Sequence, residues 1–513
     1  MKQNRLFLAV FTFIMVVACL MPRENGVISQ AAGTGKYFTE GKLYYHTISN
    51  NAVEVCGTKQ ITGTLTIPAN VTYKGKKYKV TKIADYELYT QDTTSEVNGS
   101  ETNLYAGASC SYRYDRIDGK EMPGNVDWIA GSNITKVVLP NTLTYVGNGA
   151  FNGCSKLKTV TFAKSYKKLT IGENVFGGTK IKSLVFPKGT YELKDSAAGN
   201  VPNITIPASV KKIGVGVVNY KTKKVTISKK NKKFKMKDGI LYSANEKTLY
   251  GASSKAKKKI TISKKTNRIM DKAFYKSSAS VITLNNKITV IPKGAFNSCS
   301  KLVEVRNTDN VVSIMYGAFA GCKKLQTIGT MPKLEKIEAA AFWLDSQLSV
   351  NIADTVKEVS EYAFSGTVTK TQLKSVNIAS GNQVLSVSGE FLVKVSGTEK
   401  IIIMQTSDVE NLVVPEGITE IAVCLGGVKC KKMELSSTLM VQNGRFELDS
   451  GNVIFTGKTV PKFGREFGMS GVKTVYVPKG MLEQYRQAMD SVVEERTDLK
   501  LFDEEFGPSI KEI

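Results

Sequence analysis

The chain has 513 residues, of which 42% are apolar and 23% charged, and 71 basic against 45 acidic residues give a formal net charge of +26. This composition excludes a disordered or collagen-like chain. The length exceeds what one ordinary hydrophobic core supports, so it calls for several domains or one elongated, stacked repeat.

Residues 1–31 have the features of a secretory signal peptide. Lys2 and Arg5 precede the apolar run from Leu6 to Met21, and small residues follow at Ser29 and Ala31. This order of charged, apolar and small residues predicts export. Because the run is short and no later segment reaches about 20 consecutive apolar residues, we expect no membrane-spanning helix.

The same segment has a second reading. Val16, Val17 and Ala18 before Cys19 resemble a bacterial lipobox, which would acylate Cys19 and attach the protein to a membrane. The residues after Cys19 are not the small polar ones usual behind a lipid anchor, and the C-terminus has no sorting signal. We therefore expect a secreted or cell-surface protein that meets a membrane only if Cys19 is lipidated.

Residues 32–89 form an N-terminal entry region, and residues 90–127 an inserted loop. The loop is rich in Ser, Thr, Asn, Gly and Tyr, and Tyr105, Tyr112 and Tyr114 make it a candidate binding loop, since loops that interrupt a repeat often bind. A purely decorative loop is the alternative. The chain's one histidine, His46, is expected to be a surface residue, and Cys56 and Cys110 could pair in a disulfide.

From residue 128 to 480 the sequence repeats. An Ala-Phe pair or a close relative recurs, and the last five phenylalanines are 22, 23, 23 and 22 residues apart. The predicted repeat core is therefore Phe151, Phe176, Phe274, Phe296, Phe319, Phe342 and Phe364. A β-branched residue stands five positions before each one, and strand-like alternation follows several of them.

A coil of 20 to 25 residues cannot bury its own apolar face, so coils must stack on one another. The sequence predicts a mostly β solenoid of about a dozen such coils, with the phenylalanines in an internal ladder. Two stretches are longer than one coil and predict inserted hairpins near residues 231–250 and 382–403, with Asp238-Gly239 as the first turn. Cys154, Cys299, Cys322 and Cys430 occupy a repeat position, which favours buried thiols over disulfides.

These residues resemble the BspA-type leucine-rich repeat of bacterial surface proteins. The pattern is Ile-x-x-x-Ala-Phe-x-x-Cys followed by Leu-x-x-Val, and it covers roughly residues 128–480. The segments 65–75 and 475–480 resemble the entry and exit coils of that family. The resemblance implies a leucine-rich-repeat-like solenoid, a surface or secreted location and, in some members, adhesion to host matrix proteins.

Charge is concentrated between Lys211 and Lys272, where 19 lysines and Arg268 face three acidic residues, a net of 20 minus 3, or +17. Such a surface attracts polyanions. The candidate polyanion-binding residues are Lys221, Lys223, Lys224, Lys229, Lys230, Lys232, Lys233, Lys257, Lys258 and Lys259. Nucleic acid is disfavoured because the chain is expected to be exported and lysine far outnumbers arginine. A solvated lysine face that only keeps chains apart is the alternative.

Residues 481–513 end the repeat. Met481, Leu482, Tyr485, Met489 and Val492 share one helical face, which predicts a capping helix, and an acidic tail follows. No motif supports a catalytic residue, a metal or a cofactor. We therefore expect a monomeric protein that binds a host or envelope macromolecule, either a glycoprotein or an acidic polysaccharide. A structural envelope component without a discrete ligand is the alternative, and a polysaccharide-active enzyme a more remote one.

Overall fold

The computed structural model describes residues 36–59, 61–85, 133–345, 347–364, 373–465, 467–497, 501 and 508–513. The chain forms two compact units, Met1–Ile181 and Lys182–Ile513. The predicted signal segment with Cys19, the inserted loop with Tyr105, Tyr112 and Tyr114, and Cys110 all lie outside the described residues. In the part of the chain that is described, the fold is a mostly β solenoid of about 15 turns, slightly more than the predicted dozen, with one short helix near the C-terminus.

The first unit opens with an antiparallel meander and continues as parallel coils. The meander consists of β1 (Tyr37–Glu40), β2 (Leu43–Ser49) and β3 (Ala52–Thr58). It joins the strands β6 (Lys76–Ile83), β8 (Tyr145–Val146) and β10 (Ser165–Ile171), which pair in parallel, while β5 (Asn70–Tyr73) pairs antiparallel with β6. A second parallel column contains β4 (Thr62–Thr66), β7 (Asn133–Leu139) and β9 (Thr159–Phe162).

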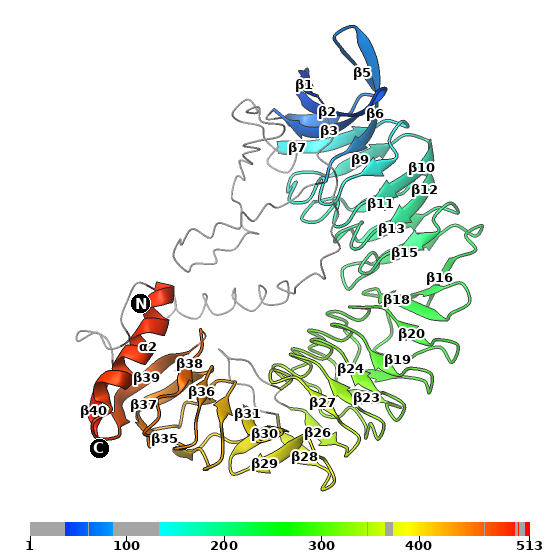
Figure 1. The fold of residues 1–513 in the computed structure, drawn as a ribbon. Helices are drawn as coiled ribbons and strands as arrows, with labels where there is room; N and C mark the ends of the chain where they lie inside the picture. Colours follow the sequence, from blue (N-terminus) through cyan, green and yellow to red (C-terminus); the bar gives the residue numbers. More distant parts are fainter. Residues whose placement is uncertain are drawn as a thin grey trace, which may run out of the picture. The chain divides into compact units, whose positions relative to one another are not determined.

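The second unit stacks its coils in chain order, and most coils contribute strands to two columns, each divided among several hydrogen-bonded sheets (Figure 1). The first column contains β11 (Ser183–Val185), β13 (Asn203–Ile206), β15 (Lys224–Ile227), β19 (Lys259–Thr261), β21 (Val281–Thr283), β23 (Glu304–Arg306), β26 (Ser349–Ile352), β28 (Ser375–Ile378), β32 (Asn411–Val413), β35 (Lys432–Leu435), β37 (Arg445–Phe455), β39 (Gly468–Val477) and β40 (Ser509–Glu512). The second contains β12 (Lys188–Leu193), β14 (Lys212–Ile213), β20 (Arg268–Ile269), β22 (Val290–Ile291), β24 (Ser313–Ile314), β25 (Lys336–Ile337), β27 (Glu358–Val359), β33 (Glu420–Ile421), β36 (Val441–Gln442) and β38 (Lys462–Phe463). The short β34 (Leu425–Gly426) pairs with β37.

The Ala-Phe turns form the third side of the coils. All seven repeat phenylalanines are 0% exposed. From Phe274 to Phe364, successive rings stack with centroids 5.2 to 5.8 Å apart and planes within 18°. Backbone hydrogen bonds join the same neighbouring turns. The Phe296 amide donates to the Ala318 carbonyl at 2.8 Å, and the Phe319 amide donates to the Ala341 carbonyl at 2.9 Å. Each turn is therefore held by the next through ring stacking and a hydrogen bond.

Repeat cysteines also connect neighbouring coils. The Cys299 Sγ donates to the Phe274 carbonyl at 2.9 Å, and the Cys322 Sγ donates to the Phe296 carbonyl at 3.0 Å. Cys154 and Cys430 are buried as well, and burial raises the pKa of the Cys154 thiol to about 12. The thiols of Cys299 and Cys322 thus satisfy backbone carbonyls inside the stack.

Two groups of antiparallel strands interrupt the parallel pattern, at the residues where the sequence predicts hairpins. The first contains β16 (Phe234–Lys237), β17 (Ile240–Ser243) and β18 (Thr248–Ala252). The second contains β29 (Leu385–Ser388), β30 (Phe391–Ser396) and β31 (Glu399–Gln405). The third strand of each group is a coil strand, because β18 pairs in parallel with β20 and β31 with β33.

The helix α2 (Leu482–Thr497) packs against β38, β39 and β40 at the C-terminal end of the stack (Figure 1). Tyr485 and Met489 are buried, and the Tyr485 hydroxyl donates to the Gly457 carbonyl at 2.8 Å. The tail expected as a polar end piece contributes β40, which pairs in parallel with β39. Among the described residues no helix has the length and apolar character needed to cross a membrane.

Candidate functional site

The ten candidate lysines are all exposed, but they lie at different places on the coil. Lys221, Lys223 and Lys224 precede or begin β15, and Lys257, Lys258 and Lys259 precede or begin β19. These two segments lie on adjoining coils, since both the amide and the Oγ of Ser254 donate to the Thr222 carbonyl. The turn between β15 and β16 carries the other four: Lys229, Lys230, Lys232 and Lys233.

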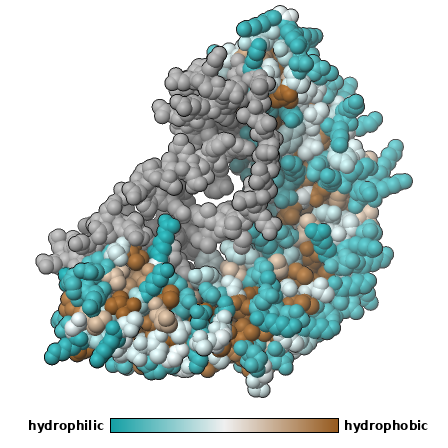
Figure 2. Space-filling view, in the orientation of Figure 1, coloured by the Kyte–Doolittle hydropathy of each residue, from teal (hydrophilic) through white to brown (hydrophobic). Residues whose placement is uncertain are grey.

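The structure therefore gives two lysine groups rather than a single row. We call the lysines at the start of β15 and β19 the strand-start group (Lys223, Lys224, Lys258 and Lys259) and those after β15 the corner group (Lys229, Lys230, Lys232 and Lys233). In the orientation of Figure 1, hydrophilic residues cover the edge of the second unit where β16 lies (Figure 2).

Few of these charges are neutralised. Of the 20 basic residues between Lys211 and Lys272, four form ion pairs within the described part of the chain: Lys212 with Glu192, Lys235 and Lys237 with Glu246, and Lys257 with Asp238. That leaves 16 without an acidic partner within 4.0 Å among those residues. A surface with so many uncompensated cations has a strongly positive potential.

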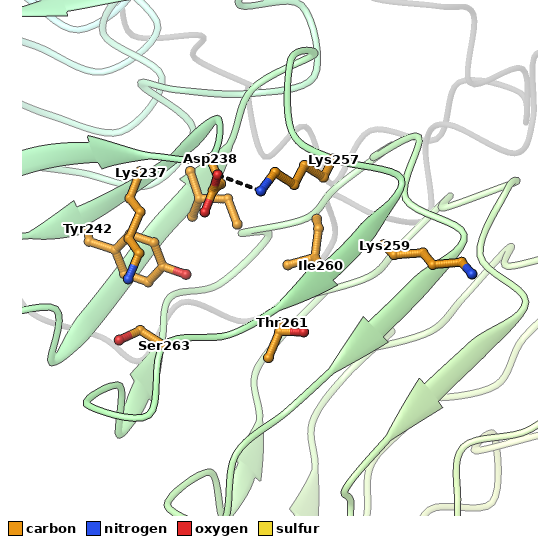
Figure 3. Close-up of a pocket in the computed structure, with 9 residues that line it drawn as sticks. Lys237, Asp238, Tyr242, Lys257, Lys259, Ile260, Thr261 and Ser263 are labelled. Carbon is orange, nitrogen blue, oxygen red and sulfur yellow. Dashed lines mark ion pairs between the residues drawn. The ribbon is translucent and has the colours of Figure 1, made fainter.

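A cavity of about 150 Å³ lies between the first inserted hairpin and β19, inside this basic region (Figure 3). Its wall contains Lys237, Asp238, Ile240, Tyr242, Lys257, Lys259, Ile260, Thr261 and Ser263. In Figure 3, Lys257 points toward Asp238, and their atoms Nζ and Oδ1 are 2.8 Å apart, whereas Lys259 extends away from that pair. The Lys257 ammonium holds the pKa of the Asp238 carboxyl below its ordinary value.

The hairpin that forms one wall is fixed by Glu246. Its carboxylate lies 2.6 Å from the Lys235 Nζ and 3.1 Å from the Lys237 Nζ, and it accepts a hydrogen bond from the Ser263 hydroxyl. Hydrogen bonds from Lys235, Ser263 and Lys237 lower the Glu246 pKa from 4.5 to about 2. Burial raises the pKa of the neighbouring Tyr242 hydroxyl to about 12. Tyr242, Glu246 and Ser263 were not among the predicted site residues.

The chemical groups of the cavity wall suit an anionic ligand. Ammonium groups and hydroxyls line the cavity, and within the described residues no three His, Cys, Asp or Glu side chains are grouped as metal ligands would be. His46 is mostly covered rather than at the surface as expected, with its Nδ1 3.0 Å from the Glu54 Oε1. Cys56 is buried on β3, and Cys110, with which it could pair, lies outside the described residues.

Comparison with known proteins bears on the repeat. Residues 125–242 and 246–371 match the model of the BspA type leucine rich repeat region, in six copies. These residues are BspA-type leucine-rich repeats. The match is interrupted at residues 243–245, where the chain passes from β17 to β18. The Ala-Phe turns from Phe151 to Phe364 all lie within the matched BspA-type ranges.

Several solved structures are similar to the chain. A leucine rich cell surface protein from Faecalibacterium prausnitzii is 20% identical over 68% of this chain and 96% of its own, with a TM-score of 0.43. A leucine-rich repeat protein from Eubacterium ventriosum is 18% identical over 70% and 99%, with a TM-score of 0.42. The pneumococcal vaccine antigen PcpA is 17% identical over 93% and 99%, with a TM-score of 0.34. No curated protein sequence is significantly similar to the chain.

Proposed function

We propose that this BspA-type repeat protein is an exported recognition protein that binds an acidic polysaccharide through the segment Lys211–Lys272. The observation that carries the proposal is the set of 16 basic side chains on one stretch of the solenoid that have no acidic partner among the residues that the structure describes. The signal-like residues 1–31 support export.

The chemistry favours an extended anion over a small one. Coils repeat along the stack at roughly 4.8 Å, so lysines at the starts of β15 and β19 are spaced along the same direction in which a polymer could run. Each lysine is a flexible point charge without the planar fork of arginine, which suits irregularly spaced carboxylates and sulfates. Such binding should weaken as salt shortens the screening length from roughly 10 Å at 0.1 M to about 3 Å at 1 M.

The experiment is saturable binding of residues 32–513 to immobilised polymers at low and high salt. The acidic polymers are chondroitin sulfate and a sialylated mucin from hosts and a teichoic acid from cell walls, and dextran is the neutral reference. Comparing the host and wall polymers distinguishes the two sources of acidic ligand.

Two variants locate the site. One changes the strand-start group to Gln, and the other changes the corner group to Gln. The matched control changes four exposed lysines near the C-terminus to Gln: Lys429, Lys458, Lys473 and Lys479. We expect either site variant to weaken binding about tenfold or more, corresponding to roughly 1.4 kcal/mol, and the control to change it little.

Equal losses in all three variants would show a general charge effect and contradict a localised site. Absence of saturable binding to every acidic polymer would overturn the proposal and favour the structural envelope role.

A further inference from the structure

Two tyrosines from different coils meet beside the Ala-Phe turns of the basic segment. The rings of Tyr220 and Tyr275 lie at 84° to each other with centroids 5.8 Å apart. The Lys276 Nζ lies 5.6 Å from the Tyr220 centroid and 5.1 Å from the Tyr275 centroid, and the Lys221 Nζ lies 5.4 Å from that of Tyr220. Both rings and Lys276 are half-buried, and Lys221 is exposed.

The tyrosines meet because the coil between them has no aromatic residue at its turn. That coil contains the first inserted hairpin, and Gly251 and Ala252 occupy the place of its Ala-Phe turn. The Ala252 amide donates to the Ala273 carbonyl at 2.8 Å, and a Cβ on Gly251 would lie 2.3 Å from the Val218 carbonyl oxygen. Only a coil without a side chain at 251 fits here, so the coils of Tyr220 and Tyr275 approach closely.

Lys276 occupies a backbone position that disfavours its side chain. It stands two residues after the repeat phenylalanine with φ 54°, in the left-handed region. At the same position, three other coils have glycine (Gly153, Gly178 and Gly321) and two others have a side chain at positive φ (Ser298 and Leu344). What distinguishes Lys276 from the residues at this position in the other coils is that its ammonium lies beside two tyrosine rings.

We propose that Tyr220, Tyr275, Lys221 and Lys276 form a subsite for one acidic sugar residue of the polysaccharide. This inference rests on the proposed function and specifies how the polymer is recognised. The apolar C–H face of a sugar ring packs against the exposed part of a tyrosine ring, while the sugar carboxylate pairs with the two ammonium groups. Charge alone would bind any polyanion, whereas the aromatic walls select for a saccharide.

The test measures binding of a hyaluronan hexasaccharide, and of the same oligosaccharide with its carboxylates reduced to alcohols, by titration calorimetry at 150 mM salt. The variants are Tyr275→Ala, Tyr220→Ala and Lys276→Gly. Lys276→Gly restores the residue found in other coils and relieves the backbone, so it should fold at least as well as the natural chain. Ser298→Gly makes the same type of change at the matching position of the next coil, where φ is 59°, and is the control.

We expect each tyrosine variant and Lys276→Gly to weaken hexasaccharide binding about tenfold, with Ser298→Gly unchanged. The reduced oligosaccharide should bind more weakly than the acidic one but still depend on Tyr275. Circular dichroism of each variant confirms that the fold is retained. If the Tyr275→Ala and Lys276→Gly proteins bind the hexasaccharide as the natural chain does, the proposed subsite is wrong. The proposed function is then tested separately, by the binding of the natural chain to the acidic polymers. If the natural chain binds the acidic polymers but not the hexasaccharide, the subsite is also wrong and the proposed function stands.

Discussion

The two inserted hairpins have the same construction but differ in net charge. In both, a two-residue turn joins the first two antiparallel strands. The second and third strands then pair with a register shift at the equivalent place, between Leu241 and Tyr242 in the first hairpin and between Leu392 and Val393 in the second. The third strand returns to the stack. Residues 231–250 carry five lysines and two acids, a net of +3, whereas residues 382–403 carry two of each and are neutral. The same insertion thus supports different surfaces, and only the first belongs to a basic region.

Their tips also differ. Asp238 and Gly239 both have positive φ, which makes the first turn type I′, whereas in the second only Gly389 does, which is the type II′ pattern. The first tip docks on the chain, since a Cβ on Gly239 would lie 2.5 Å from the Ala256 amide nitrogen. For Gly389 the nearest atom, a Pro415 side-chain carbon, is 3.7 Å away. The first hairpin is therefore a fixed wall of the cavity.

The largest loss of stability should come from disrupting the phenylalanine ladder that lies between the two hairpins. Phe319 lies in the ring ladder between them, 0% exposed and stacked on Phe296 and Phe342. Phe319→Ala should cost about 3 to 5 kcal/mol of unfolding free energy, because it removes a fully packed ring from a rigid stack. Chemical denaturation measures it, with Val413→Ala, at a side chain 55% exposed, as the control. A loss under about 1 kcal/mol would contradict the role of the ladder.

Alanine substitutions at Gly239 and Gly389 distinguish the contact between the first hairpin tip and Ala256 from the backbone strain of the turn. Both substitutions place a side chain at positive φ, at a cost of about 1 to 2 kcal/mol, but only Gly239→Ala also overlaps the backbone at Ala256. We expect about 3 kcal/mol for Gly239→Ala and about half of that for Gly389→Ala. Thermal unfolding of the two variants compares them directly. Equal losses would mean that the tip of the first hairpin is not fixed.

The carboxylate of Glu246 should make the first hairpin sensitive to acid. Its pKa is lowered to about 2 in the folded protein, so its contribution is present above about pH 4.5 and is lost as the pH falls toward 2. Because its lysine partners are 40% and 50% exposed, we expect only about 1 kcal/mol. Glu246→Gln should remove this difference between pH 6 and pH 2.5 in denaturation curves. Glu399→Gln in the second hairpin is the control for loss of one surface carboxylate, and a matching change there would contradict the assignment.

The smallest effect is expected when lysines are introduced into the second hairpin at the positions that Lys235 and Lys237 occupy in the first. Ser386 and Ser388 pair with Val393 and Phe391 as Lys235 and Lys237 pair with Tyr242 and Ile240. The double variant Ser386→Lys/Ser388→Lys should raise the affinity for chondroitin sulfate by less than about threefold at low salt, with no gain at high salt. Gln at both positions is the neutral control. A gain equal to the loss caused by changing the corner group would show that position on the solenoid does not matter.

The repeat and the first hairpin turn could be predicted because single residues determine them. The phenylalanine register follows from one side chain that must be buried in every coil, and Asp238-Gly239 is a turn whose conformation depends on those two residues. Coils without the phenylalanine, such as the one ending at Ala252, give no periodic signal, so the predicted number of turns was slightly low. The division of the lysines into two groups depends on where the chain turns after β15. The meeting of Tyr220 and Tyr275 depends on the coil between them, which has no side chain at Gly251, and neither tyrosine's local sequence indicates this.

The thiols inside the stack make the opening of individual coils measurable. Cys299 and Cys322 are 0% exposed and donate to carbonyls of the preceding coil, and burial is the main cause that raises the pKa of Cys322 well above its ordinary value. An alkylating reagent can therefore reach either sulfur only after its coil separates from the neighbouring coil. The labelling rate thus reports how often the interface between the two coils opens. Because the repeats of a solenoid contact only adjacent repeats, these two cysteines act as native reporters of the opening of two adjacent coils under denaturant, heat or mechanical load.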